Sequence, residues 1–339
     1  MIELLKTLCA LPGPSGCEDA VRDYIKNYAA PYADSMEVDP MGNLLVFRKG
    51  ERSDRKLMIC GHMDEVGVII TGITADGYLK FDFVGGVDRR VVMGKRVWVG
   101  DRRVPGIIGV KAFHLCKGEA ERVVPAVDSL YIDIGAESKE QAAALVSLGD
   151  MGTFDEDVFV FGDLLKAKAI DDRLGCAVML KLMEKKPACD TWFVFTVQEE
   201  VGTRGAGVTA FRVRPDAALI VESTTAADLP GIADHKTICK VGNGAVIPFM
   251  DRRTIYTKAF VQRMTELADA NGIRWQTKQM IAGGTDAGDI QRSCGGVPVV
   301  GVAAALRNIH SPASVGSIAD MEAVYRLAEL FMNDYAKGE

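Results

Sequence analysis

The sequence lacks several features that mark particular classes of protein. It has no run of about 18 apolar residues, the length that a membrane-spanning helix needs. Its 40 basic and 46 acidic residues are interspersed, and no basic block exceeds short pairs such as Arg252–Arg253. The first turn carries Glu3 and no apolar stretch precedes a small-residue cleavage site, as a signal peptide would require. We therefore expect no nucleic-acid partner, no membrane association and a cytoplasmic location.

The number and spacing of the cysteines and histidines limit which metal sites and disulfides the chain can form. The eight cysteines include no Cys-x-x-Cys pair, and most lie in apolar stretches. We expect free thiols in a reducing compartment rather than a disulfide framework or a zinc ribbon. Only four histidines occur, so each can be weighed by itself: His62, His114, His235 and His310.

The length and the order of predicted elements indicate two domains. A chain of 339 residues exceeds the size at which one hydrophobic core is usual. Helices and buried strands alternate in segments 1–65 and 167–339, which favours an α/β domain made from both segments. Between them, short β-like runs are separated by Gly and Asp turns. We predict that segment 66–166 is a small β-rich domain inserted into the α/β domain.

Seven polar residues lie beyond the carboxyl ends of predicted strands or just before a predicted helix. They are His62, Asp171, Asp172, Glu199, Glu200, Glu222 and His310. In open α/β sheets, ligands bind at the edge formed by the carboxyl ends of the strands. Residues that are far apart in the sequence can therefore converge there.

Each of these residues also has a purely structural explanation. Asp171 and Asp172 could cap the helix that follows, and Glu199–Glu200 could form a solvated turn. As a set, however, two imidazoles and several carboxylates form a mixed nitrogen and oxygen shell suited to zinc, cobalt or manganese. Carboxylates gathered without a cation would repel one another. The set therefore favours a metal site.

Several segments resemble the signature segments of the M42 metallo-aminopeptidases, in the same order along nearly the whole chain. They are Gly61–Gly67 (GHMDEVG), Ala169–Gly175 (AIDDRLG), Gln198–Gly202 (QEEVG), Gly283–Ala287 (GGTDA), Asn308–Ser311 (NIHS) and the opening Pro14–Glu18 (PSGCE). The resemblance implies an α/β/α catalytic domain of the dinuclear-metal aminopeptidase type, with a PDZ-like or barrel insertion that makes dimers. It also implies a peptide substrate cleaved at a free N-terminus and a homo-oligomer, the dodecamer being the form expected.

The resemblance also implies a role for each residue. Two divalent ions per subunit are expected, zinc first, with cobalt and manganese as alternatives. Asp171 would bridge them, His62 and Glu222 would complete one site, and Glu200 and His310 the other. Glu199 would be the general base for a water that bridges the ions, and Asp64 would orient His62. Apart from the resemblance, Asp286 lies between Thr285 and Ala287 in a Gly-rich loop and is a candidate to bind the ammonium group of the substrate.

One position departs from the family pattern, which usually has Asp where this chain has Glu222. Because Glu at the equivalent ligand position is common in related carboxypeptidases and deacylases, those activities remain alternatives. A glycoside hydrolase is a third, since Glu199 and Glu200 could flank a glycosidic bond, but the histidines would then have no task. His114 is expected at an interface and His235 in a surface loop.

Overall fold

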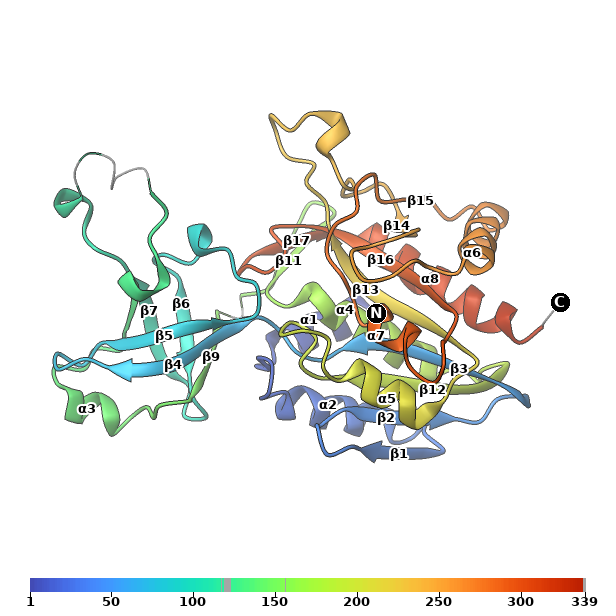
Figure 1. Ribbon diagram of the computed structural model, residues 1–339, viewed down its shortest axis with the longest axis horizontal. Helices are drawn as coiled ribbons and strands as arrows, with labels where there is room; N and C mark the ends of the chain where they lie inside the picture. The colour runs from blue at the N-terminus through green and yellow to red at the C-terminus, as the bar shows by residue number, and fades with distance from the viewer. Residues whose placement is uncertain (117, 119–122, 156, 338–339) are drawn as a thin grey trace.

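The computed structural model describes residues 1–116, 118, 123–155 and 157–337 and shows two bodies joined side by side (Figure 1). The larger body is a sheet covered by helices and contains both ends of the chain. The smaller body is a closed β-barrel formed by the middle of the chain. The predicted fold class, an α/β domain with a β-rich insertion, is therefore confirmed.

The large sheet has 11 strands, and its central strands are parallel. Strand β3 (Arg52–His62) lies between β12 (Cys189–Thr196) and β13 (Ala217–Thr225), and β13 pairs with β16 (Val299–Arg307), all in parallel. The carboxyl ends of these strands therefore share one edge. The outer strands are β1 (Ser35–Val38), β2 (Leu44–Arg48), β10 (Phe159–Phe161), β11 (Leu164–Ala167), β14 (Ala245–Val246), β15 (Trp275–Gln276) and β17 (Ser314–Ser317).

Helices cover the sheet. They are α1 (Ile2–Ala10), α2 (Asp19–Ala29), α4 (Ile170–Met183), α5 (Ala206–Val213), α6 (Lys258–Ala270), α7 (Ala287–Gln291) and α8 (Ile318–Tyr335), with the short η5 (Asp234–Lys236) in a loop. Helix α4 packs against β3 and β13, with α1 and α2 beside it, and α8 packs against β16. Among the described residues, no helix combines the length and apolarity needed to cross a membrane.

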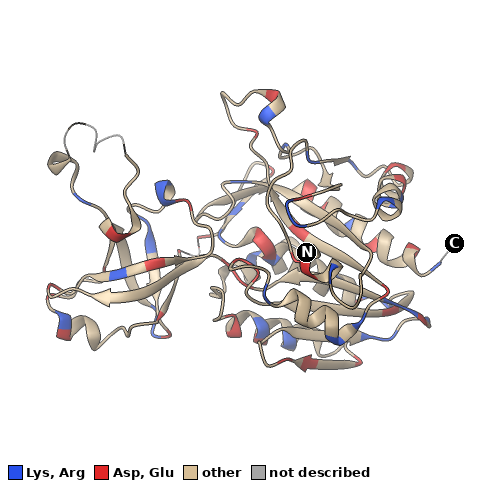
Figure 2. Cartoon of the chain, viewed as in Figure 1, with Lys and Arg blue, Asp and Glu red and all other residues tan. Residues whose placement is uncertain are grey.

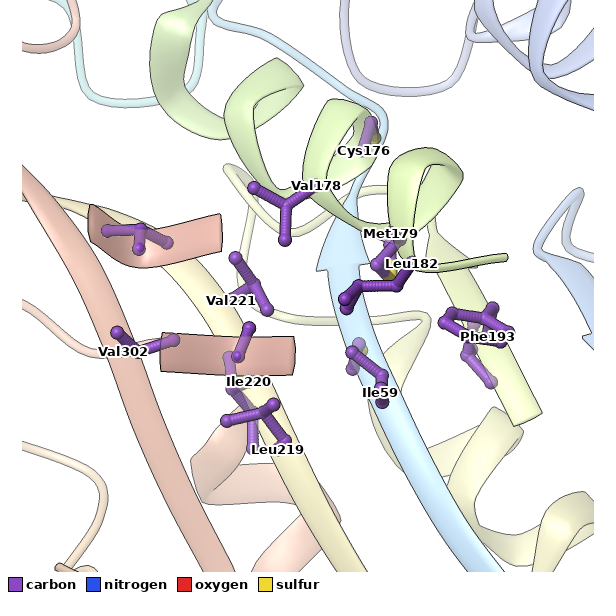
Figure 3. Close-up of a cluster of buried hydrophobic side chains, with 14 of the residues drawn as sticks. Ile59, Cys176, Val178, Met179, Leu182, Phe193, Leu219, Ile220, Val221 and Val302 are labelled. Atoms are coloured by element: carbon purple, nitrogen blue, oxygen red, sulfur yellow. The ribbon is translucent and has the colours of Figure 1, made fainter. Parts of the chain in front are cut away.

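The core lies between α4 and the central strands (Figure 3). Met179 and Leu182 of α4 face Ile59 of β3, and Phe193 of β12 lies beside them; all four side chains are fully buried. The nearly continuous apolar run 191–197 predicts such a central strand, because both faces of β12 are covered. Each side chain of this size contributes about 1.5–3 kcal/mol through burial. This packing fixes the strand ends that carry the polar residues.

The barrel closes on itself and has its own core. Its strands are β4 (Gly67–Ile73), β5 (Leu79–Val84), β6 (Arg96–Val99), β7 (Val104–Gly109), β8 (Tyr131–Asp133) and β9 (Met151–Phe154), with α3 (Lys139–Ala143), η1 (Arg89–Val91), η2 (Phe113–Leu115) and η4 (Val127–Ser129) in its loops. Alternate residues such as Val68, Ile70 and Phe81 fill the interior. Strand β10 and all but the last residue of β11 lie in the segment 66–166 expected as the insertion, yet both strands pair with the large sheet.

A buried cluster of charged residues connects the segment that leads into the barrel with the α/β body. Glu65, which leads into β4, accepts hydrogen bonds from Nζ of Lys168 (2.7 and 2.9 Å) and from the backbone nitrogen of Gly13 (3.0 Å). Nη2 of Arg173 lies 3.4 Å from the same carboxylate. Nε of Arg173 donates to the backbone oxygen of Met63 (2.8 Å). The cluster therefore joins the β3 end to the start of α4.

Candidate metal centre

The predicted ligands converge at the carboxyl edge of the central strands. His62 is the last residue of β3, Glu222 lies within β13, and Glu200 follows β12 after a short turn. His310 lies in the loop after β16. Asp171 lies in the first turn of α4, where its backbone and that of Asp172 are not yet helical. Acidic residues gather around this point, whereas charges of both signs are interspersed elsewhere (Figure 2).

Asp171 occupies the middle of the group. Its Oδ1 lies 3.5 Å from Nε2 of His62, and its Oδ2 lies 3.3 Å from Nε2 of His310. Nε2 of His310 is also 3.1 Å from Oε2 of Glu200, and Nε2 of His62 is 3.8 Å from Oε2 of Glu222. The donors thus fall into two groups that share Asp171: His62 with Glu222, and His310 with Glu200. A bridging carboxylate requires this arrangement.

The pKa values show how unfavourable this group is without a cation. Burial raises the pKa of Glu200 to about 8 and raises the pKa of Glu222 well above its ordinary value. Burial also raises the pKa of Asp171, but hydrogen bonds from His310 and His62 outweigh it and lower the pKa overall. Neighbouring carboxylates raise the pKa of both histidines although burial opposes this. With every carboxylate ionised, the site would therefore carry more negative than positive charge.

The residues present fit divalent cations. The donor atoms of His62, Asp171 and Glu200 lie within 4.8 Å of one another, as do those of His62, Asp172 and Glu222. Oε2 of Glu222 is buried and has no hydrogen-bond partner among the described residues. Buried carboxylate oxygens are normally paired or coordinate a metal. A mixed set of imidazole and carboxylate donors suits zinc, cobalt or manganese.

Asp64 connects the His62 segment with the Glu199–Glu200 segment. Its carboxylate accepts hydrogen bonds from the backbone nitrogens of Glu199 (2.9 Å) and Glu200 (3.1 Å) and from Oγ of Ser15 (2.6 Å). Nδ1 of His62 lies 3.1 Å from the backbone oxygen of Asp64 and 3.5 Å from its carboxylate. A proton on Nδ1 therefore points at Asp64, and Nε2 keeps its lone pair for a metal.

Asp172 is a buried neighbour of the ligands. Its carboxylate accepts hydrogen bonds from the backbone nitrogens of Gly175 (2.9 Å) and His62 (3.3 Å). A Cβ on Gly61 or Gly175 would lie 2.7 or 2.2 Å from Oδ2 of Asp172. A side chain at either position would collide with the Asp172 carboxylate. This is the physical reason for glycine at these positions of the GHMDEVG and AIDDRLG segments.

Glu199 differs from its neighbour Glu200. Its backbone nitrogen is held by Asp64, yet its carboxylate has no hydrogen bond or ion pair with the part of the chain that the structure describes. Burial raises the pKa of Glu199 well above its ordinary value; the positive charge of His62 opposes this, and Asp286 adds to it. The backbone of Glu199 is thus held in place, and its carboxylate lies close to the metal ligands without a partner among the described residues.

The remaining predicted residues lie in different environments. Asp286 is 2% exposed; its Oδ2 accepts a hydrogen bond from Oγ1 of Thr196 (2.5 Å), and its Oδ1 is buried without a partner among the described residues. The carboxylate therefore faces the end of β12 rather than open space. His114 lies in the exposed η2 turn of the barrel, and His235 in the exposed η5 turn.

The barrel also reaches the site, which the sequence does not indicate. Nδ1 of His310 lies 3.2 Å from the backbone oxygen of Gly86, in the loop after β5. The preceding Gly85 packs against Glu200, because a Cβ there would lie 3.3 Å from Cβ of Glu200. A Gly-Gly pair in a predicted turn carries no chemical signal of its own. The roles of Lys168 and Ser15 likewise follow only from three-dimensional contacts.

Comparisons with known proteins agree with this geometry. The sequence pattern described as M42 glutamyl aminopeptidase matches residues 42–327. The chain is 30% identical over 333 residues to the glutamyl aminopeptidase of Lactococcus lactis, covering 94% of this chain and 92% of the relative.

Solved structures share the whole fold. A TET aminopeptidase from a marine sediment archaeon of the Thaumarchaeota superposes with a TM-score of 0.94 at 34% identity, covering 99% of this chain and 98% of that chain. The TET1 peptidase of Pyrococcus horikoshii superposes with a TM-score of 0.86 at 34% identity, and each chain is covered to 98%. That peptidase can assemble into a tetrahedron or a large octahedral shell.

The pKa shifts predict how the stability of the metal-free protein depends on pH. The folded state raises the pKa of Glu200 from 4.5 to about 8. For His310, burial lowers the pKa, but Asp171 and Glu200 outweigh it and raise the value from 6.5 to about 9. Both groups bind protons more tightly in the folded than in the unfolded state. Their contribution to stability is therefore present at low pH and lost as the pH rises through these values.

We expect the free energy of unfolding of chelator-treated protein to fall steadily between about pH 5 and about pH 9. Zinc should remove most of this loss, because a bound cation stabilises the ionised ligands. Urea unfolding at a series of pH values, with chelator and with zinc, measures both curves. A chelated curve that is flat or rises over this range would contradict the interpretation.

Proposed function

Because the chain belongs to the M42 glutamyl aminopeptidase family, it is a metal-dependent aminopeptidase that removes N-terminal residues from peptides, and we propose how its residues share that reaction. The proposal depends most on one observation, the position of Asp171 between the two imidazoles. A carboxylate that offers one oxygen to each histidine is suited to bridge two ions.

Five residues are assigned as ligands of two divalent ions: His62, Asp171, Glu200, Glu222 and His310. His62 and Glu222 would hold one ion with Asp171, and Glu200 and His310 the other. Bound there, the ions would lower the pKa of water and polarise the carbonyl of the scissile peptide bond. Zinc is the ion that we propose, and cobalt and manganese suit the same donors.

Glu199 is proposed as the general base. It accepts the proton of the attacking water and then donates a proton to the leaving amine. Within the described part of the chain its carboxylate has no hydrogen bond or ion pair, which supports this role, since a ligand or an ion-pair partner could not exchange protons as easily. Asp64 would fix the position of the Glu199 backbone relative to the His62 ring, because it contacts both.

Asp286 is proposed to act on the site through its charge, from a buried position behind the ends of the strands. Its carboxylate is buried against Thr196 and Cys60, at the ends of the strands that lead to Glu199 and His62. Direct binding of a substrate ammonium group would require the side chain to become exposed. We therefore assign the charge of Asp286, rather than a direct contact, to the recognition of a positively charged N-terminus.

The alternative activities have less support. Glu222 leaves a deacylase or carboxypeptidase as an alternative, but its added methylene still leaves Oε2 3.8 Å from Nε2 of His62. Ligation is therefore compatible with Glu at this position, and the family match is to aminopeptidases. Glycoside hydrolysis needs two carboxylates and no metal. It gives no role to the contacts of His62 and His310 with Asp171.

We also propose that the chain forms a homo-oligomer in the cytoplasm. Apolar residues are exposed on the edge strand β10, where Phe159, Val160 and Phe161 are 43–46% exposed, and on the barrel loop at Phe113, which is 77% exposed. Exposed apolar patches often mark protein interfaces. All eight cysteines lie in the described chain as free thiols, which is compatible with a reducing compartment.

A dodecamer is the assembly that we expect, because TET1 has the same fold over nearly the full chain, can assemble into a tetrahedron and has been solved as a dodecamer. Light scattering after size-exclusion chromatography should give about twelve times the subunit mass of 36.6 kDa. A mass of one subunit at micromolar concentration would refute the proposal.

The division of labour between Glu199 and Glu200 is the sharpest test of the mechanism. Glu199→Gln should retain both ions and the melting temperature while kcat on unblocked peptides falls by about 10² to 10⁴, because Gln cannot accept the proton. Glu200→Gln should instead weaken one metal position and lower thermal stability.

Elemental analysis, thermal unfolding and kcat should be measured on both variants under identical conditions. The assignment is wrong if Glu199→Gln stays within a few-fold of wild type, or if it loses metal as Glu200→Gln does. Since both variants remove one negative charge from adjacent positions, each serves as the electrostatic control for the other.

A further inference from the structure

The two histidines of the metal centre are oriented by different parts of the molecule. Nδ1 of His62 points to the backbone oxygen of Asp64, two residues away on the same segment, and the ring is 2% exposed. The side chain of His310 is 36% exposed and lies in a loop. Its Nδ1 meets the backbone oxygen of Gly86, which belongs to the barrel loop after β5.

This barrel loop lies against Glu200 and His310, the two ligands that belong to one proposed metal position alone. The Gly86 oxygen accepts a hydrogen bond if Nδ1 of His310 carries the proton, so Nε2 is left free toward Asp171 and Glu200. A Cβ at Gly85 would lie 2.8 Å from Cγ1 of Val66 and 3.3 Å from Cβ of Glu200. The loop therefore limits where Glu200 and His310 can lie.

The loop has a defined conformation of its own. Gly85 has φ +84°, which side chains rarely adopt. The backbone nitrogen of Val87 donates to the oxygen of Gly85 (3.2 Å), and Asp88 caps η1 by accepting a hydrogen bond from the nitrogen of Arg90 (3.0 Å). Asp88 and Arg90 also form an ion pair (2.5 Å). The Val87 contact closes the turn around Gly86, and the Asp88 contacts order the residues that follow the loop.

We propose that the Gly85–Gly86 loop is a positioning element of the metal centre, so that the affinity of the Glu200–His310 position depends on the barrel, whereas the His62–Glu222 position does not. This inference rests on the proposed two-ion function. The partners that orient metal-bound histidines typically contribute about 10- to 100-fold in metal affinity. The inserted barrel is therefore part of the active site as well as a separate domain.

The barrel offers a matched pair of glycines for the test. Gly77, in the turn between β4 and β5, has φ +83°, and a Cβ there would lie 2.7 Å from the oxygen of Ala136. Gly85→Ala and Gly77→Ala therefore place a methyl group on the same backbone conformation in the same barrel. The atoms crowded at Gly77 are backbone atoms, whereas those at Gly85 are side chains, so the control variant is at least as disruptive to the barrel. Only Gly85 touches a proposed metal ligand. Any difference in metal binding between the two variants reports the contact with the metal centre.

Metal-free wild type and both variants should be titrated with cobalt while visible absorption and bound metal are measured. We expect two ions in wild type and in Gly77→Ala with unchanged affinities. Gly85→Ala should bind one ion normally and the other about 10- to 100-fold more weakly. If Gly85→Ala binds both ions with the affinities of wild type, the inference about the loop is wrong, while the two-ion proposal stands. One ion in wild type would overturn the two-ion proposal and this inference with it.

A second variant covers the case in which Gly85→Ala does not fold. Asp88 is exposed at the surface, and Asp88→Ala removes the cap of η1 without adding atoms near the ligands. It should also weaken only one metal position, and Asp88→Asn, which can still cap, should restore it. If Asp88→Ala folds and binds both ions with wild-type affinity, the loop does not position this half of the site.

Discussion

The crowding of buried carboxylates at one edge of the sheet is the constraint on which the rest of this site depends. Asp171, Asp172, Glu200 and Glu222 come together where water is largely excluded, so their mutual repulsion is strong. Burial raises the pKa of three of them, while Asp171, which touches both histidines, has a lowered pKa. Divalent cations would supply the missing positive charge. The same cations provide the chemistry of peptide hydrolysis.

The surrounding structure must hold this unfavourable arrangement in place. The Lys168–Glu65–Arg173 cluster connects the end of β3 to the start of α4, and removing one partner of such a buried pair typically costs about 3–5 kcal/mol. Asp64 adds a second connection, between His62 and the backbone of Glu199. These contacts connect the segments that carry His62, Asp171, Glu199 and Glu200 and keep them in register.

Much of the fold could be predicted from sequence patterns, for clear physical reasons. The apolar run 191–197 indicates a strand covered on both faces, and it forms β12 at residues 189–196. The ligand candidates could be found because polar residues that follow such strands meet at one edge. The sequence does not separate strands β10 and β11 from the insertion, because short β runs look alike in either domain. Their partners in the large sheet are distant in sequence.

Other parts of the site could not be predicted because they depend on backbone atoms. The contact between His310 and the oxygen of Gly86 involves no side chain on the barrel, so no residue type marks it. The burial of Asp286 against Thr196 depends on how α7 packs on the strands, and the motif around Asp286 says nothing of depth. Glu65 and Lys168 each resemble ordinary surface charges until the fold brings them together.

The position of the metals tests the central claim most directly. A crystal structure of the zinc-loaded protein, with anomalous diffraction recorded at the zinc edge, would locate each ion without reference to activity. We predict two peaks bridged by Asp171, one beside His62 and Glu222 and the other beside Glu200 and His310. A single peak, or ions that bind Asp172 or Glu199 in place of Asp171, would contradict the account.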